Sequence, residues 1–168
     1  MKPLHLIRRF FRSLLPTPVD ATDEEWVASV LTADELVLWQ RQPRGERSYS
    51  IRVARRAAAG LAGTKHADDD RWLAAALLHD VGKVDAGLRT PGRVVATTLG
   101  IVVPPVRRTR GRIGRYLRHP EIGAEMIRAA GGREEAARWA AVHHDPSAWT
   151  AEGVPAVVGD ALAAADNA

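Results

Sequence analysis

Four of the six histidines in this chain fall within three short segments, and an aspartate accompanies two of these segments. The segments are His79-Asp80, His119 and His143-His144-Asp145, and a further aspartate, Asp166, lies near the end of the last predicted helix. Imidazole and carboxylate groups without sulfur suit manganese, iron, nickel, cobalt or magnesium ions, and zinc less distinctively. These residues are therefore candidate metal ligands, although a His-Asp dipeptide alone also occurs in capping and core roles.

The His79-Asp80 pair needs an explanation because it lies in the most apolar helical segment, which we expect to run from Trp72 to Val84. Helical spacing places Asp80 on or beside the face that packs inward. An ionised carboxylate buried without a partner costs several kcal/mol or more. A metal ion, an arginine or Lys83 must therefore pair with it. Gly82 is expected to break the helix just past the pair and to open the site toward a loop.

The elements that must position these residues are all predicted to be helices, because no alternating run of apolar and polar residues indicates a strand. Thr22-Asp-Glu-Glu25 and Thr32-Ala-Asp-Glu35 resemble capping boxes and predict two short helices over residues 22–42. Pro43-Arg-Gly45 predicts a turn before a third helix at 47–61. Further helices are expected at 93–103, 112–118, 120–130, 133–144 and 155–166. The fold class is therefore an all-α, compact multi-helix bundle.

Composition limits the class of protein. A chain of 168 residues with 46% hydrophobic and 26% charged residues is typical of one ordinary globular domain and argues against wholesale disorder. The absence of cysteine excludes a disulfide scaffold, a cysteine nucleophile and a thiolate zinc site. We expect a basic amphipathic N-terminal extension over residues 1–18 and a single helical domain over residues 19–168.

The N-terminal residues 1–15 place four basic side chains opposite an apolar face at helical spacing. Their arginines interrupt the apolar stretch that a secretory signal requires. The segment is either a membrane-surface helix or, as we favour, an extra helix or tail of the domain. The apolar run at 94–103 is about half of the ~20 residues that a membrane span needs. We therefore expect a cytoplasmic protein with, at most, weak peripheral membrane contact through residues 1–15.

The segment Ala74-Ala-Ala-Leu-Leu-His-Asp-Val-Gly-Lys83 resembles the signature helix of the HD-domain superfamily, the metal-dependent phosphohydrolases named for this dipeptide. Arg118-His-Pro-Glu-Ile-Gly123 is similar to the His-Pro-x-x-Gly segment of the two-metal branch of that superfamily. Val142-His-His-Asp145 and Ala165-Asp166-Asn167 resemble its His-His pair and its terminal aspartate. Order and spacing agree over roughly residues 45–168.

The resemblance implies a role for each matching residue. It implies that His79, Asp80 and Asp166 hold one divalent ion, and that Asp80 bridges to a second. It gives the second ion His119 and either His143 or His144. Lys83 is expected to reach a substrate phosphate or to pair with the bridging Asp80, and these two residues are the implied catalytic pair.

The activity that the resemblance implies is hydrolysis of a phosphoester or phosphoanhydride. The substrate would be a small phosphorylated metabolite, with a nucleotide favoured, and the nucleophile a water bound to one or two ions of manganese, iron, nickel, cobalt or magnesium. The alternative is a degenerate HD domain that binds a metal or nucleotide as a regulatory module without turnover.

One departure from the family pattern motivates that alternative. Members of the superfamily carry a histidine about 30 residues before the His-Asp dipeptide, and Tyr49 occupies its place here. A neutral phenol is a much poorer ligand than imidazole at neutral pH. Either the first ion is held by fewer protein groups and more water, or that site is lost. His66 is a less favoured substitute for the missing ligand.

Six arginines lie between Arg107 and Arg118, directly before His119. They can form a solvated basic face, a nucleic-acid or membrane-headgroup patch, or a rim that binds substrate phosphate, for which Arg115 and Arg118 are the first candidates. Nucleic-acid binding is not expected, because Tyr116 alone offers a stacking surface in this stretch. Trp149, in a predicted loop, is a candidate wall of the site.

Overall fold

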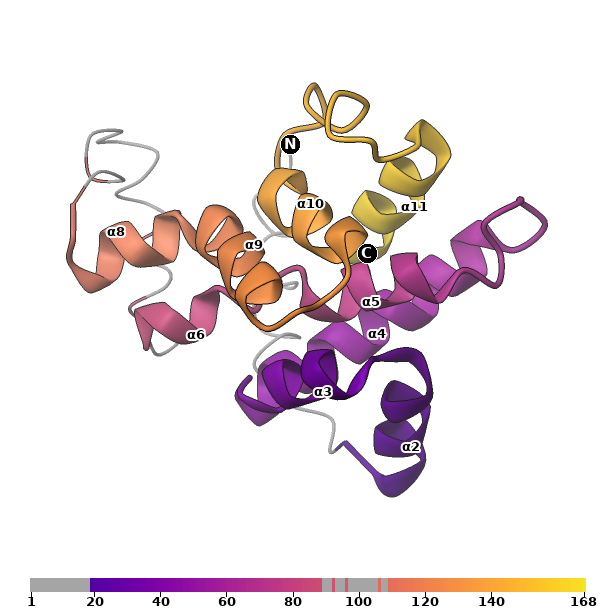
Figure 1. The fold of residues 1–168 in the computed structure, drawn as a ribbon, viewed down its shortest axis with the longest axis horizontal. Helices are drawn as coiled ribbons and strands as arrows, with labels where there is room; N and C mark the ends of the chain where they lie inside the picture. Colours follow the sequence, from indigo (N-terminus) through magenta and orange to yellow (C-terminus); the bar gives the residue numbers. More distant parts are fainter. Residues whose placement is uncertain (1–18, 89–91, 93–95, 97–105, 107–108) are drawn as a thin grey trace.

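The computed structural model describes residues 19–88, 92, 96, 106 and 109–168. The helices are α2 (Ala21–Val30), α3 (Ala33–Gln40), α4 (Arg44–Leu61), α5 (Asp70–Leu78), α6 (Lys83–Ala86), α8 (Arg112–Leu117), α9 (His119–Ala129), α10 (Glu134–Val142) and α11 (Ala156–Asn167) (Figure 1). The described residues contain no strand, which confirms the predicted all-α class. The predicted N-terminal extension and, apart from Ala96, the helix expected at 93–103 lie outside the described residues.

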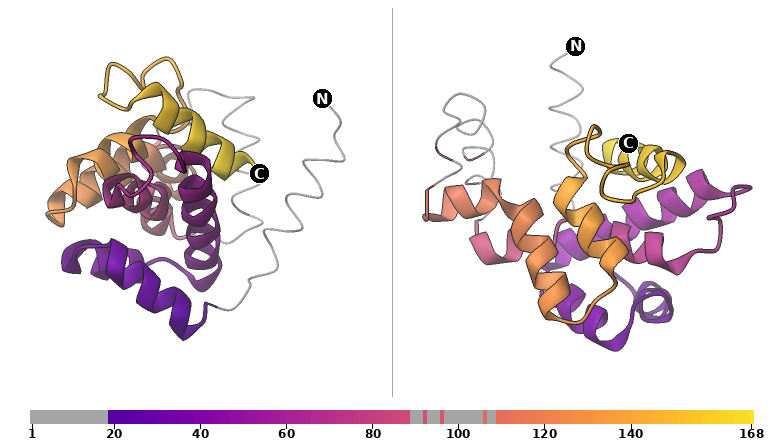
Figure 2. Two further views of the ribbon diagram at one scale, coloured as in Figure 1. Left: turned by 90° about the vertical axis from the view of Figure 1, so that its right-hand side faces the viewer. Right: turned by 45° about the horizontal axis from the view of Figure 1, so that its top comes forward.

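The centre of the fold is α5, whose residues from Trp72 to Leu78 are all buried. It packs against α4 and α10, and α2 and α3 contact it on one side. Outside these, α11 lies along α4, and α9 lies along α10. Figures 1 and 2 show α11 on the side of the molecule opposite α2 and α3. The short α6 leaves α5 and packs against α8 and α9. Within the described part of the chain, no helix combines the length and apolar character needed to cross a bilayer.

The helix ends follow local capping, which corrects two predictions. The capping box at Thr32 is confirmed, because its hydroxyl accepts from the Glu35 N–H and the Glu35 carboxylate accepts from the Thr32 N–H. The box predicted at Thr22 is wrong, because Asp20 caps α2 instead. The turn predicted at residues 43–45 is also wrong: α4 begins at Arg44, since the carbonyl of Pro43 already accepts the first helical N–H bonds.

The helix predicted from Trp72 to Val84 is divided in two. It ends at Leu78, a turn occupies residues 79–82, and α6 begins at Lys83. The imidazole of His79 helps to terminate α5, because its Nδ1 lies 2.8 Å from the carbonyl of Ala76. The last carbonyls of a helix lack partners in the next turn and are free to accept such a bond. Asp80 therefore lies in a turn and not on a helix face.

A buried ion pair fixes α3 to the start of α10. The carboxylate of Glu35 is fully buried and accepts from the Arg133 N–H at 2.8 Å and from its guanidinium at 2.5 Å. The same guanidinium donates to the carbonyl of Val30 at 2.7 Å. Burial raises the pKa of Glu35, but the hydrogen bonds from Arg133 and Thr32 outweigh it and hold that pKa below its usual value. The charge of Glu35 is thus stabilised by Arg133.

We expect Arg133→Ala to destabilise the protein by about 3 kcal/mol, because it leaves the Glu35 charge buried without its partner. Equilibrium urea unfolding followed by circular dichroism measures the change. Arg138→Ala is the matched control. Arg138 lies on α10, the helix that Arg133 precedes, and its side chain is 43% exposed, so this substitution is expected to cost less than about 0.5 kcal/mol. Equal losses in the two variants would contradict this account.

Candidate metal centre

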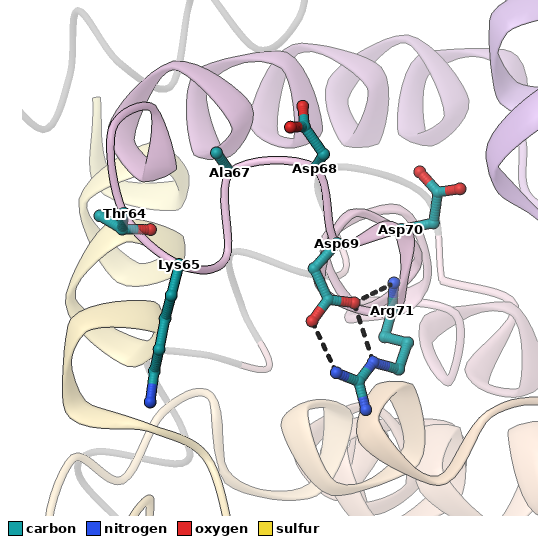
Figure 3. Close-up of a pocket in the computed structure, with 7 residues that line it drawn as sticks. All are labelled: Thr64, Lys65, Ala67, Asp68, Asp69, Asp70 and Arg71. Carbon is teal, nitrogen blue, oxygen red and sulfur yellow. Dashed lines mark hydrogen bonds and ion pairs between the residues drawn. The ribbon is translucent and has the colours of Figure 1, made fainter.

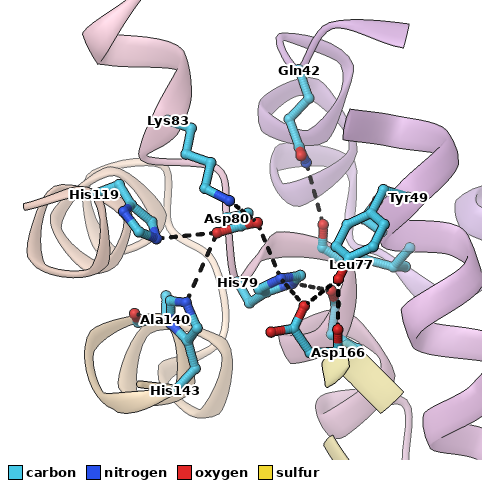
Figure 4. A network of polar contacts seen from close by, with 12 residues as sticks. Gln42, Tyr49, Leu77, His79, Asp80, Lys83, His119, Ala140, His143 and Asp166 are labelled. Atoms are coloured by element: carbon cyan, nitrogen blue, oxygen red, sulfur yellow. Dashed lines mark hydrogen bonds and ion pairs between the residues drawn. The ribbon is translucent and has the colours of Figure 1, made fainter. Parts of the chain in front are cut away.

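The turn after α5, the start of α9 and the ends of α10 and α11 bring the predicted ligands together around Asp80 (Figure 4). Asp80 Oδ1 lies 3.2 Å from His119 Nε2 and 3.8 Å from His143 Nε2. Asp80 Oδ2 lies 3.3 Å from His79 Nε2, which is also 3.5 Å from Asp166 Oδ1. The two oxygens of one carboxylate therefore face two different groups of ligands.

Three of the histidines are oriented in the same way. The Nδ1 atoms of His79, His119 and His143 each lie 2.8 Å from the carbonyl oxygen of the residue three positions earlier. In each case that carbonyl belongs to the last turn of a helix, where carbonyls lack helical partners. A proton on Nδ1 leaves the lone pair of Nε2 directed at the cluster, which is the tautomer that a metal-binding imidazole needs.

The atoms that converge at the centre fit a cation. Nε2 of His79, His119 and His143 and Oδ1 of Asp80 are buried, and none has a hydrogen-bond partner among the described residues. Leaving a buried polar atom unsatisfied costs about 1–3 kcal/mol. Four such atoms in one place, each able to donate a lone pair when its imidazole is unprotonated or its carboxylate ionised, are the donor set of a divalent metal site.

His144 completes one side of the cluster. Its side chain is exposed, and its ring centroid lies 3.8 Å from that of His143 and 5.3 Å from that of His119. One ring nitrogen from each of these three histidines lies within 4.8 Å of the others, so the three can share one ion. The choice between His143 and His144 that the sequence left open is therefore unnecessary, because both can contribute.

The comparison with protein families matches residues 49–167 to the HD domain. The chain belongs to the HD-domain family. No curated protein and no solved structure matches it. HD domains are in general metal-dependent hydrolases, which agrees with the donor set around the HD dipeptide, His79-Asp80.

The absence of a side chain at Gly82 explains how the HD dipeptide reaches His119. A Cβ atom on Gly82 would lie 2.1 Å from the carbonyl oxygen of His119 and 2.6 Å from the backbone nitrogen of Gly123. The turn of the dipeptide therefore crosses the first turn of α9 backbone against backbone. Gly82 has an ordinary helical φ of −61°, so the requirement is for space and not for an unusual backbone conformation.

The charges around Asp80 are strongly coupled. Burial raises the pKa of Asp80, but Lys83 and His79 outweigh it and hold that pKa well below its usual value. Burial lowers the pKa of His79, but the neighbouring carboxylates of Asp80 and Asp166 outweigh burial and raise this pKa to about 10. Burial and the neighbouring His79 lower the pKa of His143 to about 3. Without metal, His79 is therefore protonated at neutral pH, whereas His143 is neutral.

The ammonium of Lys83 pairs with Asp80, and 18% of the Lys83 side chain is exposed. Burial lowers the pKa of Lys83, but Asp80 outweighs it and raises that pKa. Lys83 is therefore a permanent positive charge at the edge of the HD dipeptide. This is one of the two placements that the family resemblance implies for it.

Two arginines, one on α8 and one directly after it, contact neighbouring segments. Arg115 Nε lies 3.5 Å from Asp85, and Arg118 donates to the carbonyl of Thr109 at 3.3 Å. These contacts do not test the phosphate-binding role predicted for Arg115 and Arg118, and Arg107 and Arg108 lie outside the described residues. His66 lies before α5, beside Asp69, and His79 follows the other end of that helix, so His66 is too far away to substitute for a ligand.

A cavity of about 260 Å³ opens beside the centre and is lined by four of the predicted ligands, His79, His143, His144 and Asp166. Trp149 forms part of its wall, as predicted from the sequence. Sequence reasoning missed the apolar wall that Val53 and Leu162 supply. The signal for both was helical spacing, because each lies one turn from a residue at the site, Tyr49 or Asp166.

A larger hollow, of about 400 Å³, lies at the loop of residues 64–69 and the start of α5 (Figure 3). Its side chains bond to one another: the carboxylate of Asp69 accepts from the guanidinium of Arg71 at 2.8 Å. None of the predicted metal ligands lines it. The cavity beside the HD dipeptide is therefore the candidate substrate site.

We expect Gly82→Ala to destabilise the protein by about 1–3 kcal/mol, since the new methyl group must push His119 away from Asp80. Manganese affinity should fall as well, which isothermal titration calorimetry measures. Gly45→Ala is the control, because a Cβ there meets nothing within 4 Å and alanine favours the helix. If the Gly82→Ala variant bound manganese with the same affinity as wild type, the close contact between Gly82 and the first turn of α9 would not be what positions His119.

The protonation of His79 predicts that metal binding releases protons. Because its pKa of about 10 lies above neutral pH, a metal that takes its Nε2 must displace a proton. Between pH 7 and pH 9 we expect release of at least one proton per protein and an affinity that rises about tenfold per pH unit. Calorimetry in buffers of different ionisation enthalpy measures both. A pH-independent affinity with no proton release would contradict the assignment of His79 as a ligand.

Proposed function

We propose that this HD domain is a divalent-metal-dependent phosphohydrolase. Its substrate would be a phosphoester or phosphoanhydride of a small metabolite, with a nucleotide as the favoured class. The observation that carries the proposal is the position of the Asp80 carboxylate, whose two oxygens face His79 on one side and His119 and His143 on the other. A carboxylate in this position is suited to bridge two cations.

The residues divide into two sets of ligands. One ion would be held by His79, Asp80 and Asp166. The second would be held by Asp80 together with the remaining histidines, which are His119, His143 and His144. When bound, a pair of divalent ions lowers the pKa of coordinated water and stabilises the charge on a transferring phosphoryl group.

The other residues of the site bind and orient the substrate. The ammonium of Lys83 lies beside Asp80 and can attract a phosphate oxygen as a point charge. Trp149 is held in the cavity wall by its Nε1, which donates to the carbonyl of Val142 at 3.0 Å. A cavity of about 260 Å³ is just below the usual range for ligand pockets, roughly 300–1,000 Å³, which favours a small substrate.

The alternative is a regulatory module that binds metal or nucleotide without turnover. Tyr49 favours it, because a phenol stands where the family resemblance implies an imidazole. We expect no nucleic-acid partner. The two functions differ in turnover and not in metal binding, so an assay of hydrolysis together with metal content separates them.

We expect Asp80→Asn to lower manganese-dependent hydrolysis at least about 100-fold, because the bridging charge is lost and about 3 kcal/mol or more of transition-state stabilisation goes with it. Release of inorganic phosphate from p-nitrophenyl phosphate and from nucleoside mono-, di- and triphosphates measures the rate. Asp160→Asn, which changes an exposed carboxylate on α11, is the control and should retain activity. A wild-type protein that binds metal but hydrolyses none of these substrates would favour the regulatory module.

A further inference from the structure

Tyr49 joins α4 to the end of α11 across the site. Its hydroxyl lies 2.6 Å from Oδ1 of Asp166 and 2.7 Å from the main-chain oxygen of the same residue. The two residues are 117 positions apart in the sequence. Figure 4 shows the tyrosine hydroxyl directed at Asp166, whose carboxylate lies beside His79.

Asp166 needs such a contact because of where it lies. It occupies the last turn of α11, where a carbonyl oxygen has no N–H partner in a following turn. Its side chain is 22% exposed, so solvent competes for the carboxylate. The Tyr49 hydroxyl reaches both groups of the residue and thereby fixes the helix end and the rotamer together.

We propose that Tyr49 is a positioning residue that holds Asp166 at the metal centre and is not itself a ligand. This rests on the proposed function, since it assumes that Asp166 binds an ion. The hydroxyl proton of Tyr49 is engaged by Asp166, and a metal-bound phenolate would have to give that proton up.

The consequence is that the two ions are held unequally. Without a ligand from Tyr49, one ion has three protein residues, His79, Asp80 and Asp166, and depends on Tyr49 for the orientation of one of them. The other ion has four protein residues: Asp80, His119, His143 and His144. Two of these histidines, His119 and His143, lie on the opposite side of Asp80 from the Tyr49–Asp166 contact (Figure 4).

Manganese titration without substrate tests this, with free Mn²⁺ followed by electron paramagnetic resonance. We expect wild type to bind one ion tightly and one weakly. Tyr49→Phe removes only the hydroxyl. It should lower the affinity for the weakly bound ion about 10- to 100-fold and leave the affinity for the tightly bound ion unchanged. Ser29→Ala is the control and should leave both affinities unchanged, because it removes an exposed hydroxyl that donates to the carbonyl of Trp26 on α2, away from the site.

Two further measurements separate positioning from ligation. Tyr49→His supplies an imidazole and should bind the weaker ion more tightly than wild type does. Protein loaded with ferric iron should show no phenolate-to-iron charge-transfer band, and a band that disappears in Tyr49→Phe would show that Tyr49 is a ligand. Equal affinities in wild type and Tyr49→Phe would overturn the positioning role but leave the proposed function standing. A wild-type protein that binds no manganese would overturn both.

Discussion

The structure depends on keeping one buried carboxylate ionised. Asp80 is 6% exposed and lies at the end of the most buried helix, so its charge is removed from water at a cost of several kcal/mol. Lys83 and the protonated His79 offset part of this cost in the metal-free protein. The unsatisfied Oδ1 of Asp80, facing two imidazole nitrogens, shows that these two cations do not complete the arrangement.

The same few backbone features place all the groups around Asp80. Three helices end where a histidine can donate to a free carbonyl, so helix termination and imidazole orientation have a common cause. The absence of a side chain at Gly82 lets the dipeptide turn contact the start of α9. The Glu35–Arg133 pair then fixes the start of α10, the helix that carries His143 at its other end. The candidate metal centre is thus built from helix ends and not from helix faces.

Much of the fold could be predicted because helical spacing and caps are local properties of the sequence. The helices expected at 112–118, 120–130, 133–144 and 155–166 are observed with ends that differ by no more than two residues. The errors occur where side chains decide a boundary. Asp20 competes with Thr22 for a cap, and the His79 imidazole bonds the carbonyl of Ala76 where α5 ends. Neither competition is visible in hydrophobic periodicity.

The residues of the candidate site could be predicted from the sequence, but some of the contacts that hold them could not. The order of the His and Asp segments, together with the family resemblance, identified residues that the structure brings to one place, His144 included. The partner of Tyr49 could not be predicted, because a contact between residues 117 positions apart depends on how α11 lies along α4. The cavity wall from Val53 and Leu162 depends on the same packing. Residue types therefore predicted the chemistry, and tertiary packing decided how each group is held.

Anomalous diffraction from crystals grown with manganese is the most direct test of the bridging role of Asp80. We expect two peaks about 3.5–4 Å apart on either side of its carboxylate, one beside His79 and Asp166 and the other beside His119 and the His143-His144 pair. The absence of any anomalous peak within coordination distance of Asp80 would contradict it.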